Sequence, residues 1–335
     1  MRGLTWTLLA LLPLAAACGG ESEREPKSAA GSAGSSAGPG GSGGTSGSGG
    51  SAGSAGSAGS PVTAPDCSGT FGPRVQQFSV PSPAELASPA IGPGELELFY
   101  VHYDSASAPG QFRRSTRASR EASFGSGEVV TELDGACMPD EYRTIDLSSD
   151  GLRAYLMCFS TLDFYATYGQ LRIAHRESLA APFVLDAMTY GQVGASPSIS
   201  LDELSVYTSY EQGIGSGPLQ RYSRDSADSS FEPGTDVAGL AAAAYLSSPD
   251  IGPDDRAIFA SQDGGLVRAQ RADAMSQFET PEILLPREPL ENGLFVTFGA
   301  PEASADCRTL YAVAVDDNGT GISGNGTYSI VQLRR

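Results

Sequence analysis

Residues 147–160 read LSSDGLRAYLMCFS, a Ser-Ser-Asp-Gly turn that leads into a strand of apolar and aromatic residues. When the sequence is aligned with itself, four other segments match this stretch: IGPGELELFYV (91–101), ISLDELSVYTS (199–209), IGPDDRAIFAS (251–261) and ASADCRTLYAV (303–313). The aligned copies start 56, 52, 52 and 52 residues apart, at Ile91, Leu147, Ile199, Ile251 and Ala303. A fixed period near 50 residues is typical of a repeat architecture.

Each repeat continues in the same way beyond this strand. A second aligned element begins with glycine and carries an arginine in four of its five copies, at Arg117, Arg176, Arg224 and Arg271. A phenylalanine stands seven residues beyond each arginine, at Phe124, Phe183, Phe231 and Phe278. With the strand before the turn, the pattern predicts four short strands per repeat, and four strands make one blade of a β-propeller.

The fifth repeat ends at Arg335, after its third strand, and so lacks a fourth. The segment FGPRVQQFSV (71–80) matches FGSGEVVTEL (124–133), the fourth-strand region of the first repeat. We therefore expect the N-terminal strand 71–80 to complete the last blade, because closing the ring removes the exposed strand edges. The sequence predicts an all-β fold, a five-bladed β-propeller of four-stranded blades, with six blades as the alternative.

The turn motif resembles the SPDG-type repeats of WD-repeat-like propellers, the kind found in the TolB family. Its copies are SSDG (148–151), SLDE (200–203), GPDD (252–255), SADC (304–307) and the divergent GPGE (92–95). The resemblance covers residues 67–335 and implies a fold more than a function. An aspartate repeated in four of the five copies serves the blade, so we expect Asp150, Asp202, Asp254 and Asp306 to bind the amides of their own turns.

The N-terminus has the pattern of an export signal. MRGLTWTLLALLPLAAAC has one basic residue and a short apolar stretch that ends in small residues. Its end resembles the lipobox of bacterial lipoproteins, which implies a signal peptide over 1–17 and lipidation of Cys18. Residues 18–66 are rich in Gly, Ser and Ala and predict a disordered linker, since they offer little to bury. Gly19, in place of a retention aspartate, favours the outer membrane.

Export places the remaining cysteines in an oxidising compartment, where four cysteines predict two disulfides. The first two strands of the second repeat form a hairpin around SSDG, which places Cys137 beside Cys158. In the last blade, Cys67 leads into the closing strand and Cys307 starts the second strand at the same end. We therefore expect the pairs Cys137–Cys158 and Cys67–Cys307.

Composition argues against several activities. The net charge of −18 disfavours binding to nucleic acid. CxxC and His-Cys clusters are absent and there are two histidines, so we assign no metal site and no catalytic residue. The loop DDNGTGISGNGT (316–327) offers oxygen ligands that could hold calcium, but its spacing is not that of an EF-hand.

The sequence therefore predicts an exported, monomeric lipoprotein, anchored to the membrane by its lipid, whose propeller binds an envelope protein, a peptide or a glycan without catalysis. A glycan-active or other hydrolytic enzyme is the first alternative, and a calcium-dependent surface adhesin is the second. Aromatic residues are frequent in binding hot spots. The candidate binding residues lie in the predicted loops at one end of the blades: Tyr142, Asp163, Phe164, Tyr165, Tyr168, Tyr210, Asp316 and Asp317.

Overall fold

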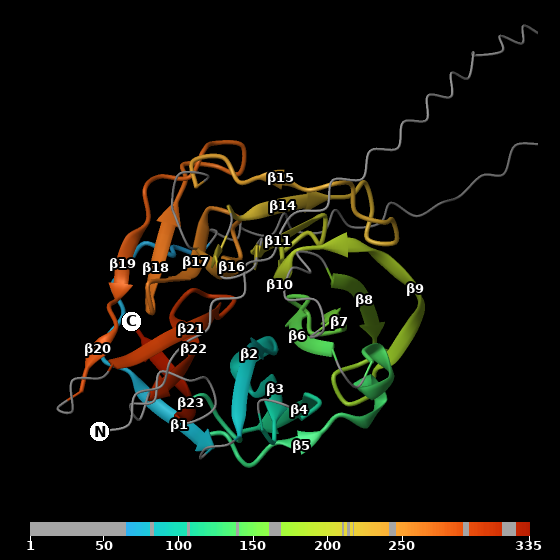
Figure 1. The fold of residues 1–335 in the computed structure, drawn as a ribbon, viewed down its shortest axis with the longest axis horizontal. Helices are drawn as coiled ribbons and strands as arrows, with labels where there is room; N and C mark the ends of the chain where they lie inside the picture. The colour runs from blue at the N-terminus through green and yellow to red at the C-terminus, as the bar shows by residue number, and fades with distance from the viewer. Residues whose placement is uncertain are drawn as a thin grey trace, which may run out of the picture. The chain divides into compact units, whose positions relative to one another are not determined.

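In the described part of the chain, twenty-three short strands and two short 3-10 helices form five sheets in a ring, together with one small separate hairpin (Figure 1). The computed structural model describes residues 65–80, 84–105, 108–138, 141–160, 169–209, 211–212, 215–216, 218–240, 246–290, 295–316 and 326–335. The predicted signal peptide, Cys18 and most of the predicted linker lie outside the described residues. In the described part, no helix is long and apolar enough to cross a membrane.

The first two blades each contain four antiparallel strands in chain order. Blade 1 consists of β2 (Glu85–Ile91), β3 (Glu97–Tyr103), β4 (Gln111–Thr116) and β5 (Glu128–Val129), with the 3-10 helices η1 (Pro93–Glu95) and η2 (Thr131–Ala136) beside them. Blade 2 consists of β6 (Glu141–Leu147), β7 (Arg153–Ser160), β8 (Gly169–His175) and β9 (Val184–Val193).

Blades 3 and 4 repeat this arrangement. Blade 3 consists of β10 (Ala195–Ile199), β11 (Ser205–Ser209), β14 (Gln220–Ser223) and β15 (Thr235–Asp236), and the hairpin of β12 (Glu211–Gln212) and β13 (Gly215–Ser216) follows β11. Blade 4 consists of β16 (Ser247–Ile251), β17 (Ala257–Gln262), β18 (Gly265–Gln270) and β19 (Glu282–Leu285).

Blade 5 combines the two ends of the described chain, as the repeat pattern predicts. It contains β21 (Phe295–Ala303), β22 (Thr309–Asp316), β23 (Thr327–Arg334) and, as its fourth strand, β1 (Val75–Val80), which pairs antiparallel with β23. The closing strand begins at Val75, later than the predicted residue 71. A two-residue strand, β20 (Glu288–Pro289), adds a fifth member beside β21. The five-blade prediction is confirmed, and the six-blade alternative is wrong.

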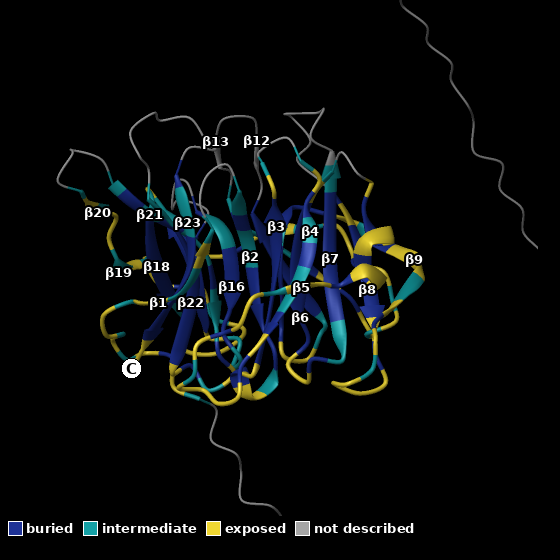
Figure 2. Cartoon of the chain, turned by 90° about the horizontal axis from the view of Figure 1, so that it is seen from below, coloured by how far each residue is buried: buried dark blue, intermediate teal, exposed yellow. Residues whose placement is uncertain are grey.

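The core is divided into five hydrophobic clusters, one at each interface between neighbouring blades. Strand β7 shows why the strands are apolar on both faces. Leu156 and Cys158 belong to the cluster shared with blade 1, whereas Tyr155 and Met157 belong to the cluster shared with blade 3. Alternate side chains of a strand point to opposite faces, so a strand between two blades must be apolar throughout. Figure 2 shows the same burial in the middle strands of the other blades.

A recurring polar contact crosses three of these interfaces. At the interface of blades 2 and 3, the Tyr155 hydroxyl contacts the Glu203 carboxylate and accepts a hydrogen bond from Arg224 Nη2 at 3.0 Å. The same contacts join Tyr207 to Asp255 and Arg271, and Tyr311 to Glu95 and Arg117. In each case the acid and the arginine come from the blade that follows the tyrosine. We call each set a Tyr–acid–Arg triad.

The phenylalanines that follow the repeated arginines complete this packing. The guanidinium carbon of each arginine lies over the ring of its phenylalanine, at 4.4 Å in the pair Arg117–Phe124 and 4.8 Å in Arg176–Phe183. The arginine side chain is thus held between a ring of its own blade and the polar groups of the neighbouring blade. Such cation–π contacts stabilise a desolvated guanidinium.

Two interfaces lack the tyrosine, and both also lack the acid. Between blades 1 and 2, Phe99 replaces the tyrosine, Gly151 replaces the acid, and Arg176 Nη2 donates to Glu97 at 2.8 Å. Between blades 4 and 5, Phe259 and Cys307 occupy the two positions. A buried hydroxyl needs a hydrogen-bond partner and a phenyl ring does not, which explains why the two positions change together.

The disulfide pairs expected from the sequence are both present. Cys67 is joined to Cys307 at the interface of blades 4 and 5, with Cα atoms 5.1 Å apart, and Cys137, which precedes β6, is joined to Cys158 in β7, at 5.3 Å. The first bond links the segment before β1 to the start of β22, where the other blades use an acid or glycine. Two disulfides are typical of proteins that fold in an oxidising compartment.

Candidate functional site

The aspartates of the repeated turn are part of the scaffold. Asp150 Oδ1 accepts hydrogen bonds from Ser148 Oγ at 2.7 Å and from the Leu152 amide at 2.9 Å. Asp202 and Asp306 make the same pair of bonds within their own turns. Partial burial raises the pKa of Asp150, but these hydrogen bonds outweigh that effect and lower it overall. The hydrogen bonding agrees with the scaffold interpretation of these residues.

A different set of side chains occupies equivalent positions on the innermost strands, which surround the axis of the ring (Figure 1). Ordered by blade, these residues are Ala90, Asp146, Ser198, Asp250 and Glu302. We call them the axial ring. Each lies one position before the last residue of an aligned inner strand, 56, 52, 52 and 52 residues apart. Three carboxyl groups therefore come from blades 2, 4 and 5.

Each polar member of the axial ring accepts a backbone amide hydrogen bond from the next blade. The Ile199 amide donates to Asp146 Oδ2 at 2.6 Å, and the Ile251 amide donates to Ser198 Oγ at 2.8 Å. In the same way the Ala303 amide donates to Asp250 Oδ2 at 2.7 Å, and the Ile91 amide donates to Glu302 Oε1 at 3.2 Å.

Ala90 breaks this cycle because it has no acceptor for the next amide, that of Leu147. The Leu147 amide instead donates to Asp146 Oδ1 at 2.7 Å, within its own blade. Four side chains thus link the inner strands around the ring, and Asp146 satisfies two amides. The three carboxyl groups therefore have a structural role, whatever other role they perform.

Burial makes the charged forms of the three carboxyl groups unfavourable. Desolvation raises the pKa of Asp146 to about 7. Desolvation, together with the negative charge of Asp146, raises the pKa of Asp250, and desolvation with the charges of Asp250 and Asp146 raises that of Glu302.

Two small chambers meet at the axial ring, and both are lined in part by Asp146 and Glu302. The corner chamber, of about 80 Å³, lies among the repeated turns and is also lined by Asp250 and Arg120. The rim chamber, of about 100 Å³, lies farther along the inner strands, among hydroxyl groups that include that of Thr144. Ligand pockets usually measure roughly 300–1,000 Å³, so either chamber has room for an ion and a few waters but not for a sugar ring.

The inner strands are bulged beside the rim chamber in every blade except blade 2. Ser88, Ser196, Ser248 and Ala300 have φ between 44° and 51°, and the strand register shifts next to each of them. Bulges re-aim the side chains that follow them. At the equivalent position of blade 2, Thr144 lies in a regular strand that pairs without a shift.

In metal-free buffer, we expect thermal stability to fall as the pH rises from about 5 to 8. The axial carboxyl groups have pKa values raised above about 4, the ordinary value in an unfolded chain. The folded chain therefore binds protons that the unfolded chain has released, and this contribution is lost as the pH passes the folded pKa. The measurement is the Tm across this pH range in EDTA.

The variant Asp146→Asn should flatten this pH dependence, because its carbonyl oxygen can still accept the Ile199 amide but it has no proton to lose. Asp236→Asn, an exposed substitution on β15, is the matched control and should leave the slope unchanged. A slope that is the same in Asp146→Asn as in the unmodified chain would contradict the assignment.

The predicted binding residue Tyr142 lies in an aromatic cluster at the other end of blades 1 and 2. Its ring stacks on Phe159, with centroids 5.3 Å apart and planes 23° apart, and meets the edge of Tyr103 at 5.9 Å. Tyr103 is anchored because its hydroxyl accepts a hydrogen bond from the Arg143 amide at 3.0 Å. Tyr142 is 40% exposed and Met138 is 66% exposed. We call Tyr103, Tyr142, Phe159 and Met138 the aromatic patch.

The other predicted binding residues do not meet at this patch in the described part of the chain. Asp316 is half-buried at the end of β22 in blade 5. The remaining ones lie outside the described residues: Asp163, Phe164, Tyr165, Tyr168, Tyr210 and Asp317. The calcium interpretation of the loop at 316–327 also depends on residues outside the described set.

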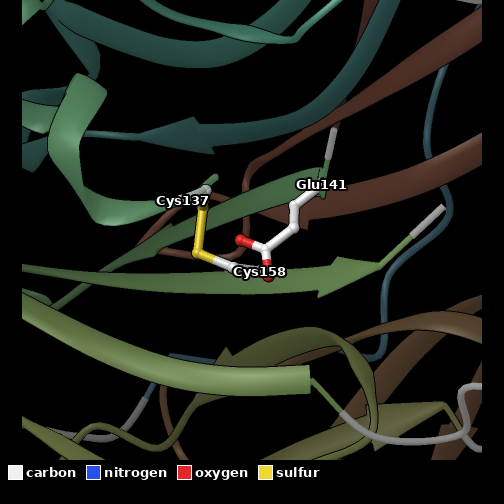
Figure 3. Close-up of side chains that lie close together, drawn as sticks. All are labelled: Cys137, Glu141 and Cys158. Carbon is white, nitrogen blue, oxygen red and sulfur yellow. A yellow bond between two sulfur atoms is a disulfide. The ribbon is translucent and has the colours of Figure 1, made fainter. Parts of the chain in front are cut away.

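Cys137, Glu141 and Cys158 bring their sulfur and carboxylate atoms within 4.8 Å of one another (Figure 3). The two sulfur atoms are bonded to each other, so neither is a thiolate that could bind a metal. Glu141 is engaged as well, because its Oε2 accepts a hydrogen bond from the Met138 amide at 2.6 Å. The disulfide and the Glu141 hydrogen bond instead stabilise the segment before β6, next to the aromatic patch.

Sequence reasoning missed the axial carboxyl groups, although a signal existed. Each aligned inner strand ends in an apolar or small residue. In three repeats the residue directly before it is acidic: Asp146, Asp250 and Glu302. A carboxyl group repeated in an otherwise apolar strand at a fixed period is a sign of an axial position.

Comparison with known proteins supports the fold alone. No family model matches the sequence, and no curated protein matches it. Among solved structures, the GH43_1 enzyme from Xanthomonas citri complexed with xylotriose has a TM-score of 0.52 and 14% identity, covering 77% of this chain and 90% of that chain. TolB from Acinetobacter baumannii has a TM-score of 0.43 and 11% identity, covering 80% of this chain and 65% of that chain.

Proposed function

We propose that the chain is an exported, lipid-anchored binding protein of the bacterial outer membrane, and that its propeller binds an envelope protein or a glycan without catalysis. The N-terminal pattern that ends at Cys18 and the two disulfides support export. The Gly- and Ser-rich segment up to residue 66 would act as a tether between the lipid and the propeller.

One observation carries the non-catalytic proposal: the axial carboxyl groups already hold backbone amides of neighbouring blades. A catalytic carboxyl group must reach a substrate, and the chambers beside Asp146 and Glu302 measure about 80 and 100 Å³. The neutral Ser198 makes the same interblade bond as the acids do. The main role of this position is therefore to hold neighbouring blades together. The two chambers are also too small to admit a sugar ring or the side chain of a bound peptide.

The aromatic patch is the proposed binding surface. Its rings are held rigid by stacking, by the Arg143 amide and by the nearby disulfide, so little conformational entropy is lost when a ligand binds. Exposed tyrosine and methionine next to acidic Glu141 and Asp104 suit a ligand with apolar surface and some positive or hydrogen-bonding character. Tyrosine is enriched among residues that dominate binding energies.

The test is affinity capture from detergent-solubilised envelopes with the full chain as bait. We expect one partner or glycan fraction to be enriched, and Tyr142→Ala to weaken its binding by about 30-fold, the effect of a hot-spot residue. Met275→Ala is the control, because Met275 is 92% exposed and lies between strands β18 and β19. Equal binding by the unmodified chain and Tyr142→Ala would contradict the proposed surface.

A hydrolase is the second candidate, favoured by the convergence of three carboxyl groups on one axis. Glycosidases use a pair of carboxyl groups, one of which has a raised pKa and acts as the acid. The similar fold of the GH43_1 enzyme makes a glycan the substrate to test first. Turnover of a glycan panel by the full chain, abolished in Asp146→Asn but retained in Tyr142→Ala, would favour this candidate over the binding protein.

A further inference from the structure

The axial ring carries a charge that the described residues do not neutralise. Among the side chains that line the two chambers in the described ranges, Arg120 is the one basic group. Its Nη1 atom is already engaged by Asp306 Oδ2 at 2.9 Å and Glu95 Oε1 at 3.4 Å. Buried carboxylates without a counter-charge are costly, so Asp146, Asp250 and Glu302 must bind protons or a cation.

A second observation points to a ligand in the rim chamber. Thr144 is 7% exposed, and its hydroxyl oxygen is buried without a hydrogen-bond partner. Thr144 and Asp146 are two positions apart on the regular strand β6, so their side chains project from the same face, and both line the rim chamber. Buried hydroxyl groups are normally satisfied, so this one indicates an occupant of the chamber.

The donor set around the rim chamber is made of oxygen. The chamber is lined by the carboxyl groups of Asp146 and Glu302 and by the hydroxyl groups of Ser88, Thr144, Ser196, Ser198 and Ser248. None of these is the nitrogen or sulfur ligand that zinc, copper or iron prefers. Carboxylate, hydroxyl and water oxygens in an irregular arrangement suit calcium, which accepts 6–8 oxygen ligands, better than magnesium, which requires a near-ideal octahedron.

We propose that the rim chamber binds one calcium ion between Asp146 and Glu302, with the Thr144 hydroxyl as a third protein ligand and water completing the shell. A divalent cation would supply the positive charge that the lining of the rim chamber lacks, because Asp146 and Glu302 line it with no basic side chain among the described residues. The chamber of about 100 Å³ has room for the ion and a few waters. The ion would tie blade 2 to blade 5 across the axis.

Calcium and protons therefore compete for the same carboxyl groups, and the test separates them. The full chain, stripped with EDTA and held at pH 8, is titrated with CaCl₂ by calorimetry, and its Tm is recorded with and without the ion. We expect one ion per chain with a Kd near 10⁻⁴ M, in the range of extracellular calcium modules, and a higher Tm at saturation. Magnesium at the same concentration should raise the Tm much less.

Two variants assign the site. Asp146→Asn should abolish calcium binding while keeping its bond to the Ile199 amide. Thr144→Val removes one oxygen without changing the charge or the shape of the side chain, and should weaken calcium binding by about 10-fold or more. Asp236→Asn, which removes an exposed carboxylate, should bind calcium as the unmodified chain does.

The proposal is overturned if 10 mM CaCl₂ at pH 8 produces neither binding heat nor a change in Tm, whereas Asp146→Asn raises the Tm at that pH. Protons alone would then neutralise the axis. It is equally overturned if calcium and magnesium act alike and Asp146→Asn responds to both, since that would be a general effect of ionic strength. Either result leaves the proposed binding function at the aromatic patch unaffected, because that surface lies outside the chamber.

Discussion

Replacing Cys67 and Cys307 with serine is expected to lower the free energy of unfolding by about 5 kcal/mol, the largest effect of any substitution considered for this protein. The two cysteines are 240 residues apart in sequence, so their bond closes nearly the whole propeller into one loop. A cross-link over a longer loop removes more conformational freedom from the unfolded chain. The measurement is urea unfolding followed by circular dichroism.

The location of this bond adds to its expected effect. At the interface of blades 4 and 5, Phe259, Cys307 and Leu333 stand where other interfaces have a Tyr–acid–Arg triad. Without the bond, this interface has neither the covalent link nor a Tyr–acid–Arg triad, and closure depends on hydrophobic packing, on the pairing of β1 with β23 and on the hydrogen bonds from Arg268 to the carbonyl groups of residues 67–69. We expect the double variant to begin unfolding by release of the N-terminal strand.

The pair Cys137–Cys158 provides the matched control. Its cysteines are 21 residues apart, and the same loop-entropy relation predicts a loss of about 3 kcal/mol when both become serine. The control variant should retain ring closure, so β1 should stay protected from hydrogen exchange. A double variant of Cys67 and Cys307 that is no less stable than the control would show that the closing strand holds by pairing alone.

The second large effect is expected at Glu95. Replacing it with alanine should lower the free energy of unfolding by about 3–5 kcal/mol, because Arg117 would remain buried without its charge partner. The side chain of Arg117 is fully buried and that of Glu95 is 4% exposed, with Nη2 and Oε2 3.3 Å apart. The Tyr311 hydroxyl, which donates to Glu95 Oε2 at 2.8 Å, would lose its acceptor as well.

The surface pair Arg74–Glu288 is the control for this prediction. Its nitrogen and oxygen atoms are 2.8 Å apart, but both side chains are about one-third exposed. Solvent screens such a pair, so Glu288→Ala should cost less than about 1 kcal/mol. Equilibrium unfolding in urea of both variants tests the contrast. If Glu95→Ala cost no more than Glu288→Ala, the Tyr–acid–Arg triad would have no special role at the interface.

Much of the fold could be predicted because each blade of a propeller is encoded by one repeat, so the sequence shows a fixed period. Each blade must bury both faces of its middle strands, so apolar segments such as AYLMC in residues 154–158 recur with turn residues between them. The match of residues 71–80 to a fourth strand placed the closing strand in the last blade. The pairing of Cys67 with Cys307 followed from that placement.

Only the arginines of the Tyr–acid–Arg triads could be predicted from the sequence. The repeated arginines predict partners within or between blades, but their identity depends on two positions in different repeats. Tyr155 and Glu203 are 48 residues apart, and Tyr311 and Glu95 are joined only across the ring closure. Sequence comparison within the chain shows that tyrosine accompanies an acid and phenylalanine does not. The contact that explains this relation exists only when the blades are stacked.

Local pattern and period were enough to establish five blades, the scaffold role of Asp150 and the cysteine pairs, because each of these depends on neighbours within one blade or on the order of the repeats. The axial ring is different. Asp146 and Asp250 are 104 residues apart, and Asp250 and Glu302 are 52 residues apart. In the sequence, each looks like an ordinary acidic residue of a β-strand. Only closure of the ring brings them to one axis, where desolvation and mutual repulsion turn three unremarkable side chains into a site that must hold protons or a cation.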